Sequence, residues 1–127
     1  MYITIDEQDG RPMYRQVVDG IKELIARGEL AAGSGLPPVR QVAADLGVNL
    51  NTIAFAYREL QKVGLIRIRH GSGAVVVAQV TGQSVAERQQ AKLRAALTDL
   101  VLAGLSRAEV LAIVNNVLNN LMGSKNR

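Results

Sequence analysis

The sequence predicts a mainly α fold with a small β-hairpin. Two amphipathic segments lie on either side of a tight turn at Gly47, and the apolar period changes from helical to two after Gly64. A further pair of apolar segments fills residues 81–127. Two helices joined by a tight turn and followed by a hairpin are typical of a winged helix-turn-helix. We therefore expect a winged helix-turn-helix in residues 1–80 and a helical hairpin in residues 81–127.

The chain begins with a predicted extended arm at Ile3–Ile5 and a first helix over Met13–Arg27. The apolar residues of this helix recur at helical spacing. Gly28 is a suitable C-terminal stop for the helix. The glycine- and proline-rich segment Ala31–Pro38 is predicted to be an irregular loop.

Two helices around Gly47 are the centre of the prediction. The first is expected over Pro38–Leu46, with Pro38 in its first turn, where a missing N–H costs nothing. The second is expected over Leu50–Val63, with Asn49 capping it through its side-chain oxygen.

A hairpin is predicted after Gly64. Leu65–His70 alternates, with Ile66 and Ile68 on one face and Arg67 and Arg69 on the other. Gly71–Gly73 is the expected tip, and Ala74–Ala78 is rich in β-branched residues typical of a strand.

The last part of the chain contains two predicted helices. Ser84–Glu87 has the spacing of a capping box before a helix over Val85–Ala103, and Ser106–Glu109 repeats it before a helix that ends near Met122.

The composition excludes several kinds of site and several classes of protein. The chain has 127 residues and a net charge of +4, with no cysteine and one histidine, so disulfides and thiolate metal sites are excluded and no metal site is expected. Residues 36–80 carry five Lys or Arg and two Asp or Glu, a basic balance that suits phosphate backbones or is ordinary solvated surface. The absence of a long apolar run and of a signal peptide predicts a cytoplasmic protein without a membrane partner. Acidic residues are scattered, so an enzyme is not expected.

Several segments together resemble the GntR family of bacterial repressors. The matching segments are Leu36–Arg40, Leu46–Thr52, Ala56–Leu60, Gly64–Ile66 and His70–Gly73, with Asp9–Tyr14 similar to the family's entry into its first helix. Residues 81–127 look like the short two-helix tail of the YtrA subfamily. A chain of 127 residues has no room for an aminotransferase domain, so the resemblance implies no pyridoxal phosphate and no other cofactor. Pro38 and Leu50 depart from the family pattern, where Ser and often Arg stand.

The resemblance implies sequence-specific binding of double-stranded DNA. A recognition helix enters the major groove with its N-terminal end, which here presents Asn49, Leu50, Asn51 and Thr52. Asn49 could instead be a helix cap alone, and Leu50 could meet a thymine methyl or fill space.

Further contacts are expected outside this turn. The resemblance implies contacts by Arg40 in the preceding helix and by His70, Gly71 and Ser72 at the wing tip. Arg58, two turns after Asn51, and Arg69, on one strand face with Arg67, are predicted to contact the DNA backbone. The wing residues could alternatively form a plain β-turn, and Arg67 and Arg69 could serve solubility. Phe55 lies off the buried stripe of its helix, and packing on the linker or C-terminal helices would explain it.

The two C-terminal helices predict a homodimer. Their apolar arc is broader than one neighbouring helix can cover, and two helices cannot make an independent core. The predicted interface is Leu93, Leu97, Leu100, Val110, Val114, Val117, Leu118 and Leu121. The helix pair could instead fold back on residues 1–80.

The sequence therefore predicts a DNA-binding transcriptional repressor that binds a pseudo-palindromic operator as a homodimer. A protein-interaction module on the same scaffold is the alternative. No residue identifies a small-molecule effector, although a dimer interface could bind one.

Overall fold

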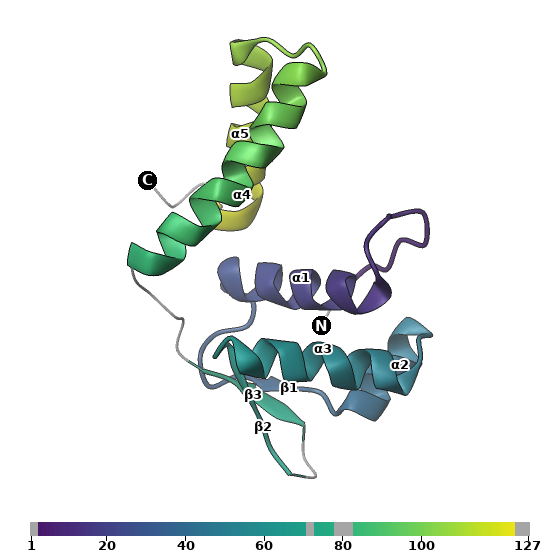
Figure 1. Ribbon diagram of the computed structural model, residues 1–127. Helices are drawn as coiled ribbons and strands as arrows, with labels where there is room; N and C mark the ends of the chain where they lie inside the picture. The colour runs from purple at the N-terminus through teal and green to yellow at the C-terminus, as the bar shows by residue number, and fades with distance from the viewer. Residues whose placement is uncertain (1–2, 71–72, 78–82, 124–127) are drawn as a thin grey trace. The chain divides into compact units, whose positions relative to one another are not determined.

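A computed structural model describes residues 3–70, 73–77 and 83–123 (Figure 1). The chain divides into two compact units, residues 1–80 and residues 81–127, and each is described by itself. The first unit contains three helices and a three-stranded antiparallel sheet, and the second contains two helices.

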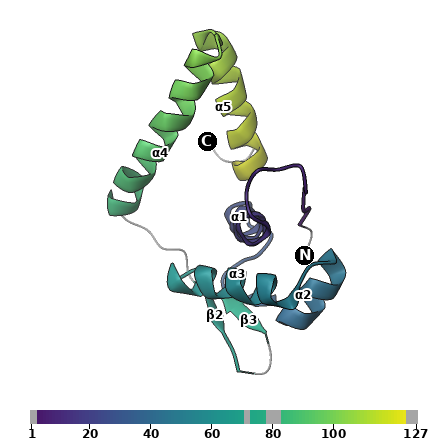
Figure 2. The same cartoon turned by 45° about the vertical axis from the view of Figure 1, so that its right-hand side comes forward.

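Helix α1, Met13–Ala26, supplies one wall of the core of the first unit. Its inward face is apolar, and the helix crosses α3 (Leu50–Lys62), as the end-on view of α1 in Figure 2 shows. The expected arm at Ile3–Ile5 is not a strand, but Ile3 and Ile5 are half-buried against the core. Gly20 makes this contact feasible, because a Cβ there would lie 2.9 Å from Cγ2 of Ile3.

The helix-turn-helix consists of α2, Val39–Leu46, and α3. Gly47 ends α2 in the left-handed conformation, with φ of 69°, which glycine adopts without the steric cost of a Cβ. Asn49 caps α3, because its side-chain oxygen accepts a hydrogen bond from the backbone N–H of Asn51. Pro38 precedes α2 instead of lying in its first turn, and it provides no side-chain cap.

The sheet contains one strand that the sequence did not predict. Strands β2, Ile66–Ile68, and β3, Ala74–Val76, form the expected hairpin. Residues Gly35–Leu36 form β1 and pair antiparallel with β3, so the strand order is β1-β3-β2. The prediction of an irregular loop was therefore wrong at these two residues, because the open edge of β3 offers the loop backbone hydrogen-bond partners.

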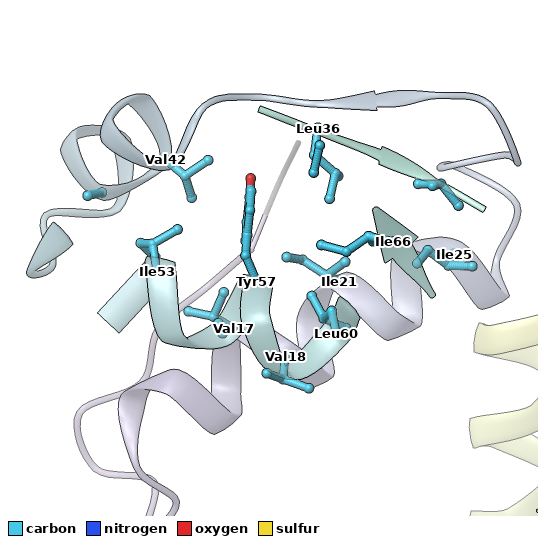
Figure 3. Close-up of a cluster of buried hydrophobic side chains, with 14 residues drawn as sticks. Val17, Val18, Ile21, Ile25, Leu36, Val42, Ile53, Tyr57, Leu60 and Ile66 are labelled. Atoms are coloured by element: carbon cyan, nitrogen blue, oxygen red, sulfur yellow. The ribbon is translucent and has the colours of Figure 1, made fainter. Parts of the chain in front are cut away.

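The core of the first unit lies between α1, α3 and the sheet. Figure 3 shows Tyr57 at its centre, between side chains from α1, α2 and the strands. Val17, Ile21, Ile53, Tyr57 and Leu60 are fully buried. Burial of a large apolar side chain contributes roughly 1.5–3 kcal/mol, so this cluster is the main source of stability for the unit.

The second unit is an antiparallel hairpin of α4, Gln83–Leu102, and α5, Arg107–Met122 (Figure 1). The capping box at Ser106 is present, with both reciprocal hydrogen bonds to Glu109. The box predicted at Ser84 was wrong in position, since α4 begins at Gln83, two residues before the expected start at Val85, and Ser84 therefore lies inside the helix. Of residues 86–123, none is buried.

Candidate nucleic-acid interface

The first turn of α3 is accessible to a ligand. Asn49, Leu50 and Asn51 are exposed and Thr52 is half-buried, so the fold does not occlude this segment. The Asn49 oxygen lies 2.7 Å from the Asn51 nitrogen, which commits that oxygen to the cap. The amide nitrogen is then the donor that Asn49 can offer to a ligand. Helix N-termini favour phosphate through the helix dipole.

A groove borders this turn and joins it to the wing. It is lined by α2 and the residues before it, by the N-terminal half of α3 and by the wing: Pro38, Val39, Arg40, Leu50, Asn51, Ala54, Tyr57, Ile68, Arg69 and Gly73. Its surface is mainly apolar, yet it includes the two exposed arginines Arg40 and Arg69. The groove therefore combines an apolar surface with positive charge.

The hydroxyl of Tyr57 holds one wall of the groove in place. It donates a hydrogen bond of 2.7 Å to the carbonyl oxygen of Pro37. Burial raises the pKa of Tyr57 to about 12, because ionisation would place a charge in an apolar environment. The hydroxyl therefore remains a donor throughout the physiological range.

Gly73 holds the opposite wall. Its φ is +82°, and a Cβ there would lie 2.6 Å from the carbonyl oxygen of Leu36 and 3.3 Å from the nitrogen of Pro38. The wing thus packs directly on the backbone that leads into α2, and both elements bordering the groove are fixed to each other.

The wing is also tied to α3 and closed at its tip. The side-chain oxygen of Gln61 accepts a hydrogen bond of 2.7 Å from the backbone N–H of Ile68. The Arg69 N–H donates to the Gly73 carbonyl oxygen at 2.7 Å and closes the hairpin. His70 is exposed, and the predicted contacts Gly71 and Ser72 lie outside the described residues. The role of Gln61 was missed, because a lone glutamine on an exposed helix face carries no signal.

Arg58 and Phe55 lie on the exposed face of α3. The guanidinium of Arg58 lies 5.8 Å from the centre of the Phe55 ring, and that ring meets Tyr14 edge-on, with centroids 4.7 Å apart. Phe55 therefore packs on α1, which differs from the expected packing on the linker or C-terminal helices. Cation–π contact orients Arg58 on this surface.

The arginines around the groove carry uncompensated charge. Within the described ranges, no carboxylate lies within ion-pairing distance of Arg40, Arg58 or Arg69, whereas Lys62 pairs with Glu59 at 3.1 Å at the other end of α3. Positive charge is therefore available at Arg40 and Arg69 beside the groove and at Arg58 on the exposed face of α3. The part of the chain that the structure describes holds no group of three metal-binding side chains.

The residues predicted to form the dimer interface differ in their exposure to solvent within the α4–α5 hairpin. Five are half-buried: Leu97, Leu100, Val110, Val114 and Leu121. Leu93, Val117 and Leu118 are exposed, by 55%, 49% and 45%. Leu111, Ile113 and Met122 add exposed apolar surface to α5, and their apolar character in sequence could have included them in the predicted interface.

The fold and its surface define a class of protein. A tight helix-turn-helix with an exposed first turn on its second helix, flanked by a wing and by unpaired arginines, is a winged helix-turn-helix DNA-binding domain of a transcriptional regulator. Residues 13–76 match the family described as "Bacterial regulatory proteins, gntR family". The chain belongs to the GntR family, and it is close to the YtrA-type regulators within it.

Several known proteins are similar over most of the chain. The HTH-type transcriptional repressor YtrA of Bacillus subtilis is 28% identical, over 97% of both chains. A structure titled transcriptional antiterminator, from Listeria monocytogenes, has a TM-score of 0.88 and 28% identity, over 98% of this chain and 95% of that one. YtrA from Sulfolobus acidocaldarius, titled a GntR-family transcription factor, has a TM-score of 0.65 and 36% identity, over 77% and 99%.

Two similar structures of the AraR DNA-binding domain contain operator DNA, one with ORE1 and one with ORX1. The DNA-binding domain of AraR in complex with operator ORE1 has a TM-score of 0.52 and 25% identity, over 61% of this chain and 94% of that chain.

In the present structure, no helix among the described residues is both long and apolar enough to cross a bilayer.

Proposed function

We propose that the chain is a homodimeric repressor that binds a pseudo-palindromic operator in double-stranded DNA. The observation that carries the proposal is the exposed first turn of α3, which borders a groove with two unpaired arginines. An operator complex of the similar AraR domain supports the same mode of binding. The name of the similar Bacillus subtilis protein, a transcriptional repressor, supports the direction of regulation.

The proposal assigns readout and positioning to different residues. Asn51 and Thr52 lie in the first turn of α3, where amide and hydroxyl groups can bond base edges in the major groove. Arg40 and Arg69 line the groove beside that turn and suit phosphate oxygens, which fix the register without reading sequence. Arg58, and His70, Gly71 and Ser72 of the wing, are the further proposed contacts.

The dimer is proposed to form through α4 and α5. A two-helix hairpin in which none of residues 86–123 is buried cannot be stable alone, and its exposed apolar side chains are suited to a second copy of the same surface. A two-fold dimer presents two α3 helices to two half-sites about one helical turn, or a multiple of one, apart.

Binding of duplex DNA at two or more salt concentrations tests the central claim. Each phosphate contact contributes about −0.9 to the slope of log affinity against log salt, so Arg40→Gln should reduce the slope by roughly 2 in a dimer. Lys62→Gln is the matched control, because it removes the same charge from a side chain that is paired with Glu59. A protein that binds no duplex at low salt would overturn the proposal.

The interface is tested by Val117→Asp, with Asn116→Asp as the control. Both changes place a carboxylate on the exposed surface of α5, but only the first removes an apolar side chain. We expect Val117→Asp to yield monomers in sedimentation and to lose operator affinity at the same time. An intact dimer in this variant would exclude the proposed interface.

A further inference from the structure

The groove beside α3 has an apolar side chain at the position closest to the start of the helix. Leu50 is the first residue of α3, and 41% of it is exposed. Ala54, one turn later, and Ile68 of the wing line the same groove. Apolar residues gathered on a surface that meets DNA are suited to an apolar partner there.

The partner can be identified from the chemistry of base edges. In the major groove, hydrogen-bond donors and acceptors dominate, and the C5-methyl group of thymine is the apolar feature that distinguishes one base. Arg40 and Arg69 in the same groove complement the phosphates of a nucleic acid strand, whereas an apolar peptide would bury their charges without a partner, which is costly.

The groove is also rigid enough to select its ligand. The Tyr57–Pro37 hydrogen bond holds the α2 side, and the close packing of Gly73 on Leu36 holds the wing side. A preformed apolar wall loses little entropy on binding, so even a methyl group contributes measurable discrimination.

We propose that Leu50 reads the 5-methyl group of a thymine in each operator half-site. The inference rests on the proposed DNA-binding function and specifies one base that the operator requires. Leu50 then distinguishes T·A from the other pairs by an apolar contact, at a position where Asn51 and Thr52 supply polar ones.

The experiment replaces thymine by deoxyuridine, which removes the methyl group and keeps base pairing. Duplexes enriched from a random-sequence pool by the full chain serve as probes, and each thymine is replaced in turn. At one position per half-site, the substitution should weaken binding about fourfold, the factor expected for one buried methyl group, and roughly 15-fold when both half-sites are changed.

Variants then assign the effect to Leu50. Leu50→Ala should bind the thymine and deoxyuridine duplexes equally well, and Leu50→Met should retain the discrimination. Val63→Ala is the matched control, since Val63 is an exposed apolar residue at the other end of α3.

The outcomes separate the two proposals. If the pool yields no enriched duplex, the proposed function fails. If duplexes are enriched but no thymine is sensitive to loss of its methyl group, or if Leu50→Ala discriminates as the unchanged chain does, the role of Leu50 is refuted and DNA binding stands.

Discussion

Gly73→Ala should destabilise the chain more than the same change at a left-handed glycine that has open space around it, such as Gly28. Two costs act together at Gly73. Its φ of +82° costs an L-residue about 1–2 kcal/mol, and the added Cβ would lie 2.6 Å from the Leu36 carbonyl oxygen. That oxygen belongs to a backbone segment held by β1 and by the Tyr57–Pro37 hydrogen bond, so it cannot move without breaking other contacts.

Gly28 offers a matched control. Its φ is +84°, nearly the same as that of Gly73, but a Cβ there would meet nothing within 4 Å. Gly28→Ala therefore measures the left-handed cost alone, about 1–2 kcal/mol. The steric overlap should add about 1 kcal/mol or more to the cost of Gly73→Ala, which corresponds to a further decrease in Tm of about 4–8 °C for a unit of this size.

Urea denaturation of the full chain, followed by circular dichroism at a fixed protein concentration, measures both changes. Operator affinity gives a second readout, because displacement of the wing should weaken binding in Gly73→Ala and not in Gly28→Ala. Equal free energies of unfolding for the two variants would refute the reasoning, since the packing of Gly73 on Leu36 would then have no energetic consequence.

Four further changes test other contacts. Tyr57→Phe removes the donor to the Pro37 carbonyl and should lower the free energy of unfolding by about 1–3 kcal/mol in urea titration. Because the pKa of Tyr57 is raised to about 12, this difference from the unchanged chain should be full below pH 10 and should shrink between pH 10 and 12. An unchanged urea midpoint would contradict a role for this hydrogen bond. Leu50→Arg should shift the base preference in pool selection towards guanine, because Arg bonds guanine bidentately; an unchanged preference would argue against base contact by residue 50. Ser106→Ala should destabilise α5 by about 1 kcal/mol, measured by thermal denaturation, because it removes the hydroxyl oxygen that accepts the Glu109 N–H; an unchanged Tm would contradict this cap. The backbone N–H of Ser106 donates to the Glu109 carboxylate and lowers its pKa, so Glu109→Gln should be less stable than the unchanged chain at neutral pH, and this difference should shrink as the pH falls through the carboxylate range; a pH-independent difference would exclude the Glu109 contact.

The helices and the hairpin could be predicted from the sequence because their physical causes are local. Apolar spacing defines the buried face of α3, and Gly47 and Asn49 end and begin helices through their own backbone and side-chain chemistry. The capping box at Ser106 is present for the same reason, whereas α4 begins before Ser84 because a sequence pattern places the end of a helix only to within one or two residues.

Features that depend on distant partners could not be predicted. Two residues, Gly35–Leu36, carry no alternation, and their strand exists because β3 presents an unpaired edge. The packing of Phe55 on Tyr14 requires the crossing of α1 and α3, which no local pattern encodes. The helix-turn-helix motif and the family resemblance indicated the first turn of α3 as the candidate site, whereas the groove depends on how α2, α3 and the wing pack together.

None of residues 86–123 is buried, so the order of the α4–α5 hairpin depends on contacts outside it. If a second copy supplies those contacts, mass action links helix content to the amount of protein present. At low protein concentration, the first unit would then be folded, whereas α4 and α5 would be largely unfolded. The fraction of operator sites that are occupied would then rise more steeply than the protein concentration. Regulation would therefore begin only above a threshold concentration of the protein.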